Sequence, residues 1–267
     1  MIISISFLIL YSKGLLLILC MMSLLWLVSV LMKNAGIADI FWGIGFAVVN
    51  LFYYLASGAS GTRSNILLIL VTVWGFRLAG HLAIRNLGKP EDFRYQKFRH
   101  QYGEKRYWWV SFFQVFLLQG LLMWLISAPF TGTHLNRQQA ELNVFDLLAF
   151  LLWVIGFAFE AGGDRQLASF RARPANRGKL LDTGFWRYTR HPNYFGDAAV
   201  WWAFGLFSVA AGNVLPLLSS LLMTILLVRI SGVALLEKTL RDNKPGYREY
   251  MEKTSPFIPW FPKKPKQ

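Results

Sequence analysis

Seven runs of mostly apolar residues dominate the sequence, and each is about as long as the roughly 20 residues that a helix needs to cross a bilayer. Apolar residues make up 55% of the 267-residue chain, more than a soluble domain usually carries. Within lipid, only helices and closed barrels satisfy their own backbone hydrogen bonds, and runs of this length suit helices. The sequence therefore predicts an all-α, polytopic membrane protein with about seven transmembrane helices, over residues 14–32, 37–56, 64–84, 109–130, 143–162, 193–212 and 214–236.

Three further features bear on helix ends and on the number of domains. The apolar residues 1–11 are too short to span a bilayer and lack the basic start of a secretory signal, so we interpret them as an extension of the first helix. The sequence APFTGT, residues 128–133, combines proline with glycine and is predicted to end the fourth helix. No linker or internal repeat interrupts the chain, which predicts a single integral membrane domain over residues 1–267.

The 28 Lys and Arg residues are distributed unevenly among the loops. Seven lie in residues 85–108, seven in 163–192 and eight in 237–267, and counting helices puts these three segments on one side of the membrane. The opposite loops, 57–63 and 131–142, hold one Arg each. The positive-inside rule then predicts an N-out, C-in topology, in the inner membrane if the source is bacterial. The net charge of +14 is thus concentrated in loops on one side of the membrane. The chain lacks the soluble basic face that nucleic-acid binding needs.

Polar side chains inside apolar runs are costly in lipid, so those that occur mark functional sites or structural pairs. In the second run, Asp39 and Asn50 fall on one helical face, with Gly43 and Phe46 between them. An interhelical hydrogen bond, or an ion pair between Asp39 and Arg77, is the structural alternative to a catalytic role.

The end of the fifth run carries an acidic stripe. At spacings of i, i+4, i+7 and i+11, one helical face presents Glu160, Asp164, Leu167 and Arg171. Two carboxylates one turn apart repel each other unless they accept hydrogen bonds or meet cations. The hydroxyl groups of an adenosine ribose are one such partner, and the alternative is a solvated helix end paired with its own arginines.

A basic loop runs into the sixth helix at RHPNYFGD, residues 190–197. Pro192 suits the first turn of a helix, where its missing N–H costs nothing. One face of that helix then carries Asn193, Gly196 and Asp197, and the glycine allows another backbone or a flat ligand to approach. Free N–H groups at a helix N-terminus favour anions. Together with Arg190 and His191 they predict a phosphate-binding corner, the alternative being contact with anionic lipid headgroups.

Two of these segments resemble the C-terminal half of the steroid 5-alpha-reductase family: GGDRQLASFR (162–171) and GKLLDTGFWRYTRHPNYFGDAAVWW (178–202). The chain as a whole resembles the bacterial-type branch labelled DUF1295, which is related to the isoprenylcysteine methyltransferase-like proteins. The segments that carry this resemblance include ADIFWGIGF (38–46), WGFRLAGHLAIRNLGKPEDFRYQKFR (74–99) and LEKTLRDNKPGYREYMEKTSPFIP (236–259).

This resemblance implies a membrane enzyme that holds NADPH in a cytosol-facing cavity. It would reduce a carbon–carbon double bond conjugated to a carbonyl in a steroid-like or other lipophilic substrate. Residues 1–142 would then be substrate-side helices and 143–267 the cofactor-binding half. Matching motifs assign to the cofactor Asp164, Leu167, Arg171, Tyr188, Asn193, Tyr194, Gly196, Asp197 and Arg229, and the residue patterns above add Glu160, Arg190 and His191.

The chain departs from the family pattern at several positions. Glu160 stands where the family has an Asn, and Val233 and Glu237 stand where it has a His and a Tyr. Characterised reductases polarise the substrate carbonyl with a membrane-embedded Glu and Tyr, and this chain has no Glu before Glu91. The predicted catalytic replacement is Asp39 with His81, or Asp39 with Tyr95 of EDFRY. Because negative charge develops on the carbonyl oxygen, a donor must meet it there, and Asp39 would either be protonated or orient the true donor.

Two other functions remain open. A membrane methyltransferase that uses S-adenosylmethionine would share the RHPxYxG signature, but its acid lies four residues after the arginine, whereas Glu237 follows Arg229 by eight. A transporter or lipid-binding protein would need the paired, broken half-helices that this sequence lacks. The expected partners are a lipophilic substrate and membrane lipids, with the chain as a monomer. The lone Cys20 and four scattered His residues predict neither a disulfide nor a metal site.

Overall fold

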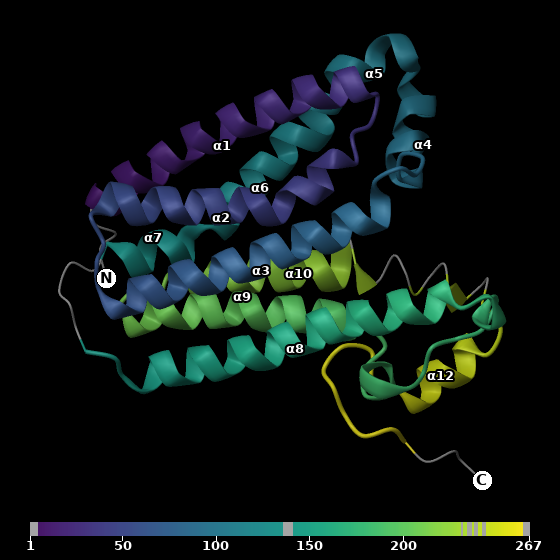
Figure 1. Cartoon of the computed structure of the whole chain (residues 1–267). Coiled ribbons are helices and arrows are strands. Elements are labelled where there is room, and N and C mark those ends of the chain that lie inside the picture. The colour runs from purple at the N-terminus through teal and green to yellow at the C-terminus, as the bar shows by residue number, and fades with distance from the viewer. Residues whose placement is uncertain are drawn as a thin grey trace. The chain divides into compact units, whose positions relative to one another are not determined.

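The computed structural model describes residues 5–135, 141–230, 232–233, 237, 240–241 and 244–263. Within them the elements are helices, apart from one isolated bridge between Thr189 and Ser255, which confirms the all-α prediction. Figure 1 shows, in chain order, α1 (Ile5–Met32), α2 (Ile37–Ser57), α3 (Thr62–Asn86), α4 (Phe93–Tyr102), α5 (Glu104–Ser111), α6 (Leu118–Ile126), α7 (Ala128–His134), α8 (Val144–Ala172), α9 (Pro192–Ala210), α10 (Leu217–Ile225) and α12 (Tyr247–Lys253). A π-helical turn joins α5 to α6 at Phe112–Leu117, and another follows α10 at Leu226–Ile230.

Five helical segments are long and apolar enough to cross a membrane, and they correspond to the first five predicted runs: Ile5–Met32, Ile37–Ser57, Thr62–Asn86, Glu104–His134 and Val144–Ala172. The first segment is helical from Ile5 onward, which agrees with residues 5–11 extending the first helix, and residues 1–4 of that prediction lie outside the described part of the chain. The chain is therefore a multi-pass helical membrane protein by the length and composition of its helices.

The last two predicted runs have weaker counterparts in the structure. The sixth run is α9, whose first turns carry Asn193 and Asp197, and it is not among those five segments. The seventh is the shorter apolar segment Leu217–Ile230. Residues 231 and 234–236 of that prediction lie outside the described part of the chain.

The predicted end of the fourth helix is wrong. The segment APFTGT forms most of α7, so helical structure continues to His134. Pro129 occupies the first turn of α7, where a missing backbone N–H breaks no intrahelical hydrogen bond. Proline here begins a helical segment instead of stopping one.

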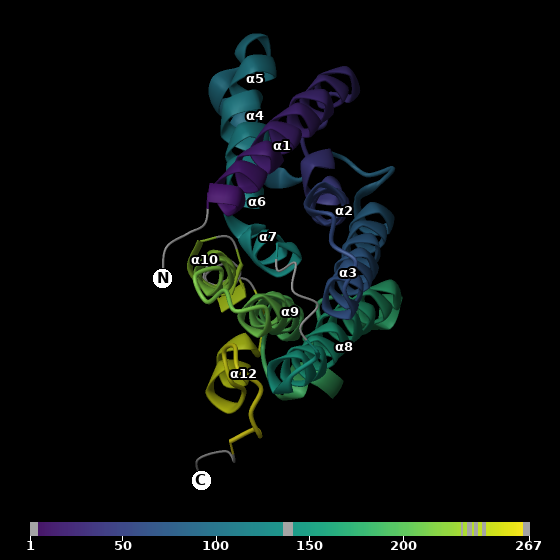
Figure 2. The same cartoon turned by 90° about the vertical axis from the view of Figure 1, so that its left-hand side faces the viewer.

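The chain divides into two compact units, one of Met1–Leu142 with Phe207–Ser219 and one of Asn143–Leu206 with Ser220–Gln267. In the first unit, α2 packs against α1, α3, α6 and α7, and α4 and α5 follow one another at one end (Figure 2). A Cβ added to Gly43 would lie 2.2 Å from the carbonyl oxygen of Gly75, and one added to Gly75 would lie 2.4 Å from that of Gly43. Helices in lipid associate through this kind of close backbone contact, because burying apolar surface there gains little.

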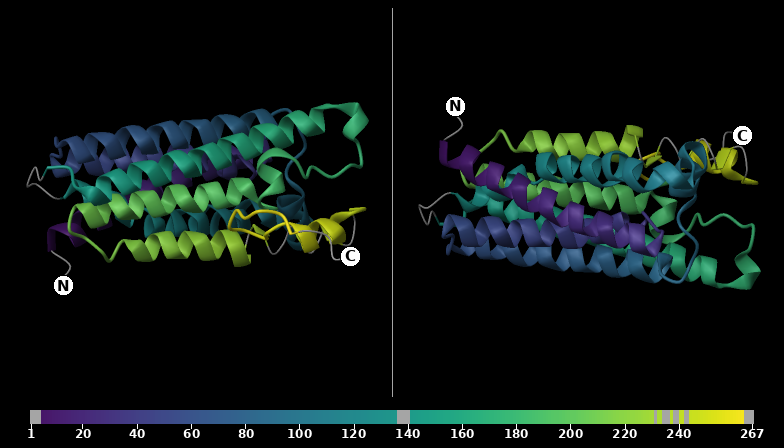
Figure 3. Two further views of the ribbon diagram at one scale, coloured as in Figure 1. Left: turned by 90° about the horizontal axis from the view of Figure 1, so that it is seen from below. Right: turned by 90° about the horizontal axis from the view of Figure 1, so that it is seen from above.

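The second unit is built on a similar contact between α8 and α9, which run side by side (Figure 3). A Cβ added to Gly196 would lie 2.3 Å from the backbone nitrogen of Glu160 and 2.4 Å from the carbonyl oxygen of Gly156. The glycine of RHPNYFGD thus admits the backbone of a neighbouring helix. This contact sets Glu160 directly beside the first turns of α9.

Replacing Gly75 with Ala should destabilise the first unit, because the new methyl group collides with the backbone of α2. Overpacking of this kind costs about 1–3 kcal/mol. The matched control is Gly80→Ala on the same helix, where an added Cβ meets nothing within 4 Å. Thermal unfolding in detergent should show a lower Tm for Gly75→Ala and an unchanged or raised Tm for Gly80→Ala. Equal Tm values for the two variants would contradict the close crossing of α2 and α3.

Candidate functional site

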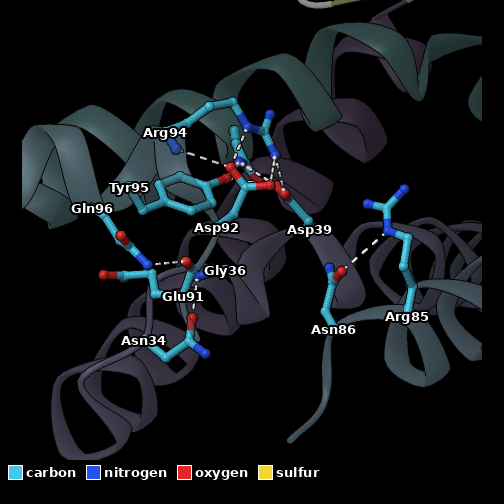
Figure 4. Close-up of polar contacts among 11 residues, drawn as sticks. Asn34, Gly36, Asp39, Arg85, Asn86, Glu91, Asp92, Arg94, Tyr95 and Gln96 are labelled. Atoms are coloured by element: carbon cyan, nitrogen blue, oxygen red, sulfur yellow. Dashed lines mark hydrogen bonds and ion pairs between the residues drawn. The ribbon is translucent and has the colours of Figure 1, made fainter. Parts of the chain in front are cut away.

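In the first unit, the predicted catalytic residues Asp39 and Tyr95 meet in a polar cluster between the first turns of α2 and α4 (Figure 4). The Tyr95 hydroxyl donates to Asp39 Oδ1 at 2.6 Å. The Arg94 guanidinium donates to Asp39 Oδ2 at 2.7 Å, forming an ion pair. Gln119 Nε2 lies 3.4 Å from Asp39 Oδ1 and 3.3 Å from the Tyr95 hydroxyl oxygen. We call these four residues the Asp39 cluster.

Local structure explains why two successive residues of α4 reach the same carboxylate. Asp92 caps α4 by accepting a hydrogen bond from the backbone N–H of Arg94 at 3.0 Å, which starts the helix at Phe93. Asp92 also accepts from Arg94 Nε at 2.9 Å and so directs the guanidinium. Burial would raise the pKa of Asp92, but the hydrogen bonds and charge of Arg94 outweigh it and hold that pKa below its ordinary value. The cap therefore remains ionised at neutral pH.

A second ion pair holds α4 against the start of α2. Glu91 accepts from the backbone N–H of Ala35 at 2.7 Å and pairs with Arg99 at 3.0 Å (Figure 4 shows Glu91). The Arg99 guanidinium also lies over the ring of Tyr107, 4.6 Å from its centre. These contacts fix the position of Tyr95 relative to Asp39.

The electrostatics of the Asp39 cluster keep a proton on Tyr95. Burial raises the pKa of the Tyr95 phenol, and the negative charge of Asp39 and the hydrogen bond to it raise it further. For Arg94, desolvation is outweighed by the hydrogen bond to Asp92 and the charge of Asp39, so its pKa is raised and it stays cationic. The Arg94 and Asp39 side chains remain 37% and 19% exposed, whereas Tyr95 is buried. Chemically, the cluster is a phenol donor oriented by a carboxylate beside a fixed positive charge.

The structure brings together one of the two predicted catalytic pairs. His81 lies half-buried on α3 and, among the described residues, is not one of those bonded to Asp39. Arg94 and Gln119 were not identified from the sequence. The signal for Arg94 was its place beside Tyr95 in EDFRY, and the signal for Gln119 was an amide within the apolar run 109–130.

In the second unit, the acidic stripe of α8 meets the start of α9. Glu160 and Asp164 are buried, at 3% and 7% exposure, and Asn193 donates to Asp164 Oδ1 at 3.1 Å. Further along the same helix Leu167 is half-buried, and Arg171 is exposed in the last turn. A predicted pair of sites, on α8 and at the start of α9, is thus joined by a direct hydrogen bond.

Arg190 is committed to contacts within the protein. Its side chain is buried, and its Nε and Nη2 lie 2.8 Å from Glu237 Oε1. Its Nη1 donates to the carbonyl oxygens of Met251 at 2.8 Å and Thr254 at 3.2 Å. His191 Nε2 lies 3.3 Å from the same oxygen of Glu237. Burial would raise the pKa of Glu237, but the hydrogen bond from His191 and the charge of Arg190 hold it below its ordinary value.

Around Arg190, the segment Thr254–Lys263, which we call the C-terminal strap, is fastened to residues 187–190. Two backbone N–H groups and one side-chain hydroxyl donate three hydrogen bonds between the two segments: Arg190 N–H to Ser255 O (2.9 Å), Thr189 Oγ1 to Phe257 O (2.8 Å) and Trp260 N–H to Tyr188 O (2.9 Å). The Tyr250 hydroxyl donates to the carbonyl oxygen of Trp186 as well. The strap therefore holds the loop that leads into α9.

The remaining predicted cofactor residues of the second unit differ in exposure and in the element that carries them. Tyr188 is exposed beside the strap, and the ring of Tyr194 stacks on His191 with 5.8 Å between ring centres. Asp197 is half-buried on α9, and Arg229 is exposed in the π-helical turn after α10. In the described part of the chain, no three His, Cys, Asp or Glu side chains are grouped so as to hold a metal ion.

The helices define a multi-pass helical membrane protein. The model of the family described as "Protein of unknown function (DUF1295)" matches residues 25–254, so the chain belongs to the DUF1295 family, as predicted. A Schizosaccharomyces pombe relative, itself named as an uncharacterized protein, is 28% identical over 93% of this chain and 79% of its own length. No solved structure matches the chain.

Replacing Glu237 with Gln should loosen the strap by removing the charge that Arg190 and His191 meet. Hydrogen bonds to charged groups contribute about 1.5–3 kcal/mol. Because the pKa of Glu237 is lowered in the folded protein, its contribution is complete above its unfolded value, about 4.3, and is lost as pH falls through the folded value.

Thermal unfolding across this range checks the prediction. Wild type should exceed Glu237→Gln in Tm at neutral pH, and the difference should shrink in acid, below pH about 4. Glu252→Gln, at an exposed position of α12, is the matched control and should unfold like wild type. A difference in Tm that does not change with pH would contradict the role of the ionised carboxylate.

Proposed function

We propose that this chain is a membrane-embedded, NADPH-dependent reductase of a carbon–carbon double bond conjugated to a carbonyl in a lipophilic substrate. The observation that carries the proposal is the 2.6 Å hydrogen bond from the Tyr95 hydroxyl to Asp39 at the start of α2. An oriented phenol beside a carboxylate is the kind of donor that reduction of an enone requires. The proposal includes an enzyme that is monomeric and crosses the membrane with seven helices in an N-out, C-in topology. If the source is bacterial, that membrane is the inner membrane.

The residues of the Asp39 cluster have distinct roles in this reaction. Bound NADPH would supply a hydride, and negative charge would develop on the substrate carbonyl oxygen. Tyr95 would turn its hydroxyl away from Asp39 and donate a hydrogen bond to that oxygen while keeping its proton. Asp39 orients the phenol, and Arg94 pairs with Asp39 and adds positive potential at the cluster. Gln119 holds the phenol oxygen through Nε2, and its buried Oε1, which has no hydrogen-bond partner in the described residues, is an acceptor for a bound molecule.

The residues of the second unit fit part of a dinucleotide. Asp164 is a buried carboxylate bonded to the amide of Asn193, and Glu160 is buried one turn before it on α8; together they form a donor and acceptor set that suits ribose hydroxyls. Arg190 does not fit a phosphate-binding role, because its guanidinium already meets Glu237 and two carbonyl oxygens. Arg171 and Arg229 are exposed and are the arginines that would meet the phosphates.

Binding of the cofactor gives the first test of this function. Purified protein should bind NADPH more tightly than S-adenosylmethionine in calorimetry. Asp164→Ala and Arg171→Ala should each weaken NADPH binding by roughly tenfold or more, as loss of a charged hydrogen bond predicts. Arg165→Ala, at an exposed position on the same helix, is the matched control and should bind like wild type. Tighter binding of S-adenosylmethionine would favour the methyltransferase alternative, for which RHPNYFG is also typical.

Turnover gives the second test. With a lipophilic enone as substrate, Tyr95→Phe should lower the rate of NADPH oxidation about a hundredfold, because a donor to the developing oxyanion is lost. Asp39→Asn should also lower the rate, and both variants should keep the NADPH affinity of wild type. Tyr102→Phe, an exposed tyrosine at the other end of α4, is the control and should retain full activity. Wild-type turnover in Tyr95→Phe would exclude the phenol as the donor.

A further inference from the structure

The C-terminal strap presents apolar side chains to its surroundings although its backbone is fixed. Ile258, Trp260 and Phe261 are 66%, 71% and 75% exposed. The backbone N–H of Trp260 donates to Tyr188 O, and that of Lys263 donates to Lys253 O, both at 2.9 Å. These side chains are therefore held outward by a fastened segment, and folding of the unit does not cover them.

The attachment of the strap places these side chains at a definite level along α8. The apolar part of α8 ends at Phe159, before Glu160. The turn that carries the strap is bonded farther along, through Trp186 Nε1 to Gly163 O at 3.1 Å and Phe185 N–H to Gln166 Oε1 at 3.0 Å. Those contacts lie about 6–10 Å beyond Phe159 at 1.5 Å of helix rise per residue. The headgroup layer on each side of a bilayer is about 5–8 Å thick, so the nearer contact falls within that layer and the farther one just beyond its outer edge.

The charges near the strap suit that environment. Exposed basic side chains occur in the strap at Lys263 and in the segments bonded to it at Arg187 and Lys253. Aromatic side chains flanked by Lys and Arg are typical of protein segments at the membrane–water interface, where the rings enter the headgroup layer and the cations meet lipid phosphates. Among possible covers for the apolar group, an anionic membrane surface matches both its apolar and its basic part.

We propose that Ile258, Trp260 and Phe261, together with Arg187, Lys253 and Lys263, form an interfacial surface that binds the anionic headgroups of the surrounding bilayer. This surface is separate from the Asp39 cluster and does not depend on the proposed reductase activity. Because Thr189 and Arg190 are bonded to the strap, lipid contact would also steady the loop that leads into α9.

Depth measurement in nanodiscs tests the proposal. In a Cys20→Ala background, Trp260→Cys carries a nitroxide label, and the protein is placed at one copy per disc in phosphatidylcholine, with or without phosphatidylglycerol. The control is the same label at Lys179→Cys, in the exposed loop beyond the end of α8. The label at position 260 should be less accessible than the control to a water-soluble nickel reagent, and phosphatidylglycerol should lower its accessibility further. Ile258→Cys provides a second labelled position.

Removal of the basic residues separates lipid binding from simple burial. Each Lys or Arg near an anionic surface contributes about a fivefold preference for it. Arg187→Gln with Lys253→Gln and Lys263→Gln should therefore erase the effect of phosphatidylglycerol on the label at position 260. Equal nickel accessibility at positions 260 and 179 would overturn the proposal. So would protection at position 260 that neither phosphatidylglycerol nor the triple substitution changes. One copy per disc excludes protection by a second chain.

Discussion

Charged groups inside a membrane protein must find opposite charges or hydrogen bonds, and the arrangement of this chain depends on how it meets that requirement. The pair of Arg94 with Asp39 holds α4 on the first turn of α2, and the pair of Arg190 with Glu237 holds the loop before α9 to the C-terminal part of the chain. Both pairs join residues far apart in sequence, by 55 and 47 positions. Each pair therefore positions a segment as well as neutralising a charge.

The same pairing separates the arginines by role. Arg94 is partly exposed and lies against a carboxylate that also orients Tyr95, so it contributes to the polar cluster at the start of α2. Arg190 is buried and uses its donors on Glu237 and on two carbonyl oxygens. A motif that looks like a phosphate-binding corner in sequence thus has a structural arginine at its centre. For the nucleotide of the proposed function, the candidate polar groups are then those of α8 and Asn193.

The membrane helices were predictable from the sequence to a greater extent than the points where helices end. Apolar runs of about 20 residues predict membrane helices reliably because lipid leaves the backbone few alternatives. The first five runs agree with the structure for that reason, whereas α9 and the segment after it carry polar groups or are short. APFTGT was misjudged because proline in a first helical turn looks the same in sequence as proline at a helix end.

The sequence by itself determined the helical, membrane-spanning class of this protein and, through resemblance, its family and the choice of Tyr95. It also showed Asp39, Asp164 and Asn193 as unusual polar residues in or beside apolar runs. Periodicity along one helix is enough for that, since it shows which residues share a face. Only the tertiary structure decided which residues meet: Arg94 and Gln119 at Asp39, and Glu237 at Arg190. Those partners come from other helices and loops, and a hydrogen bond depends on the distance and direction between two atoms, which spacing along the chain does not contain.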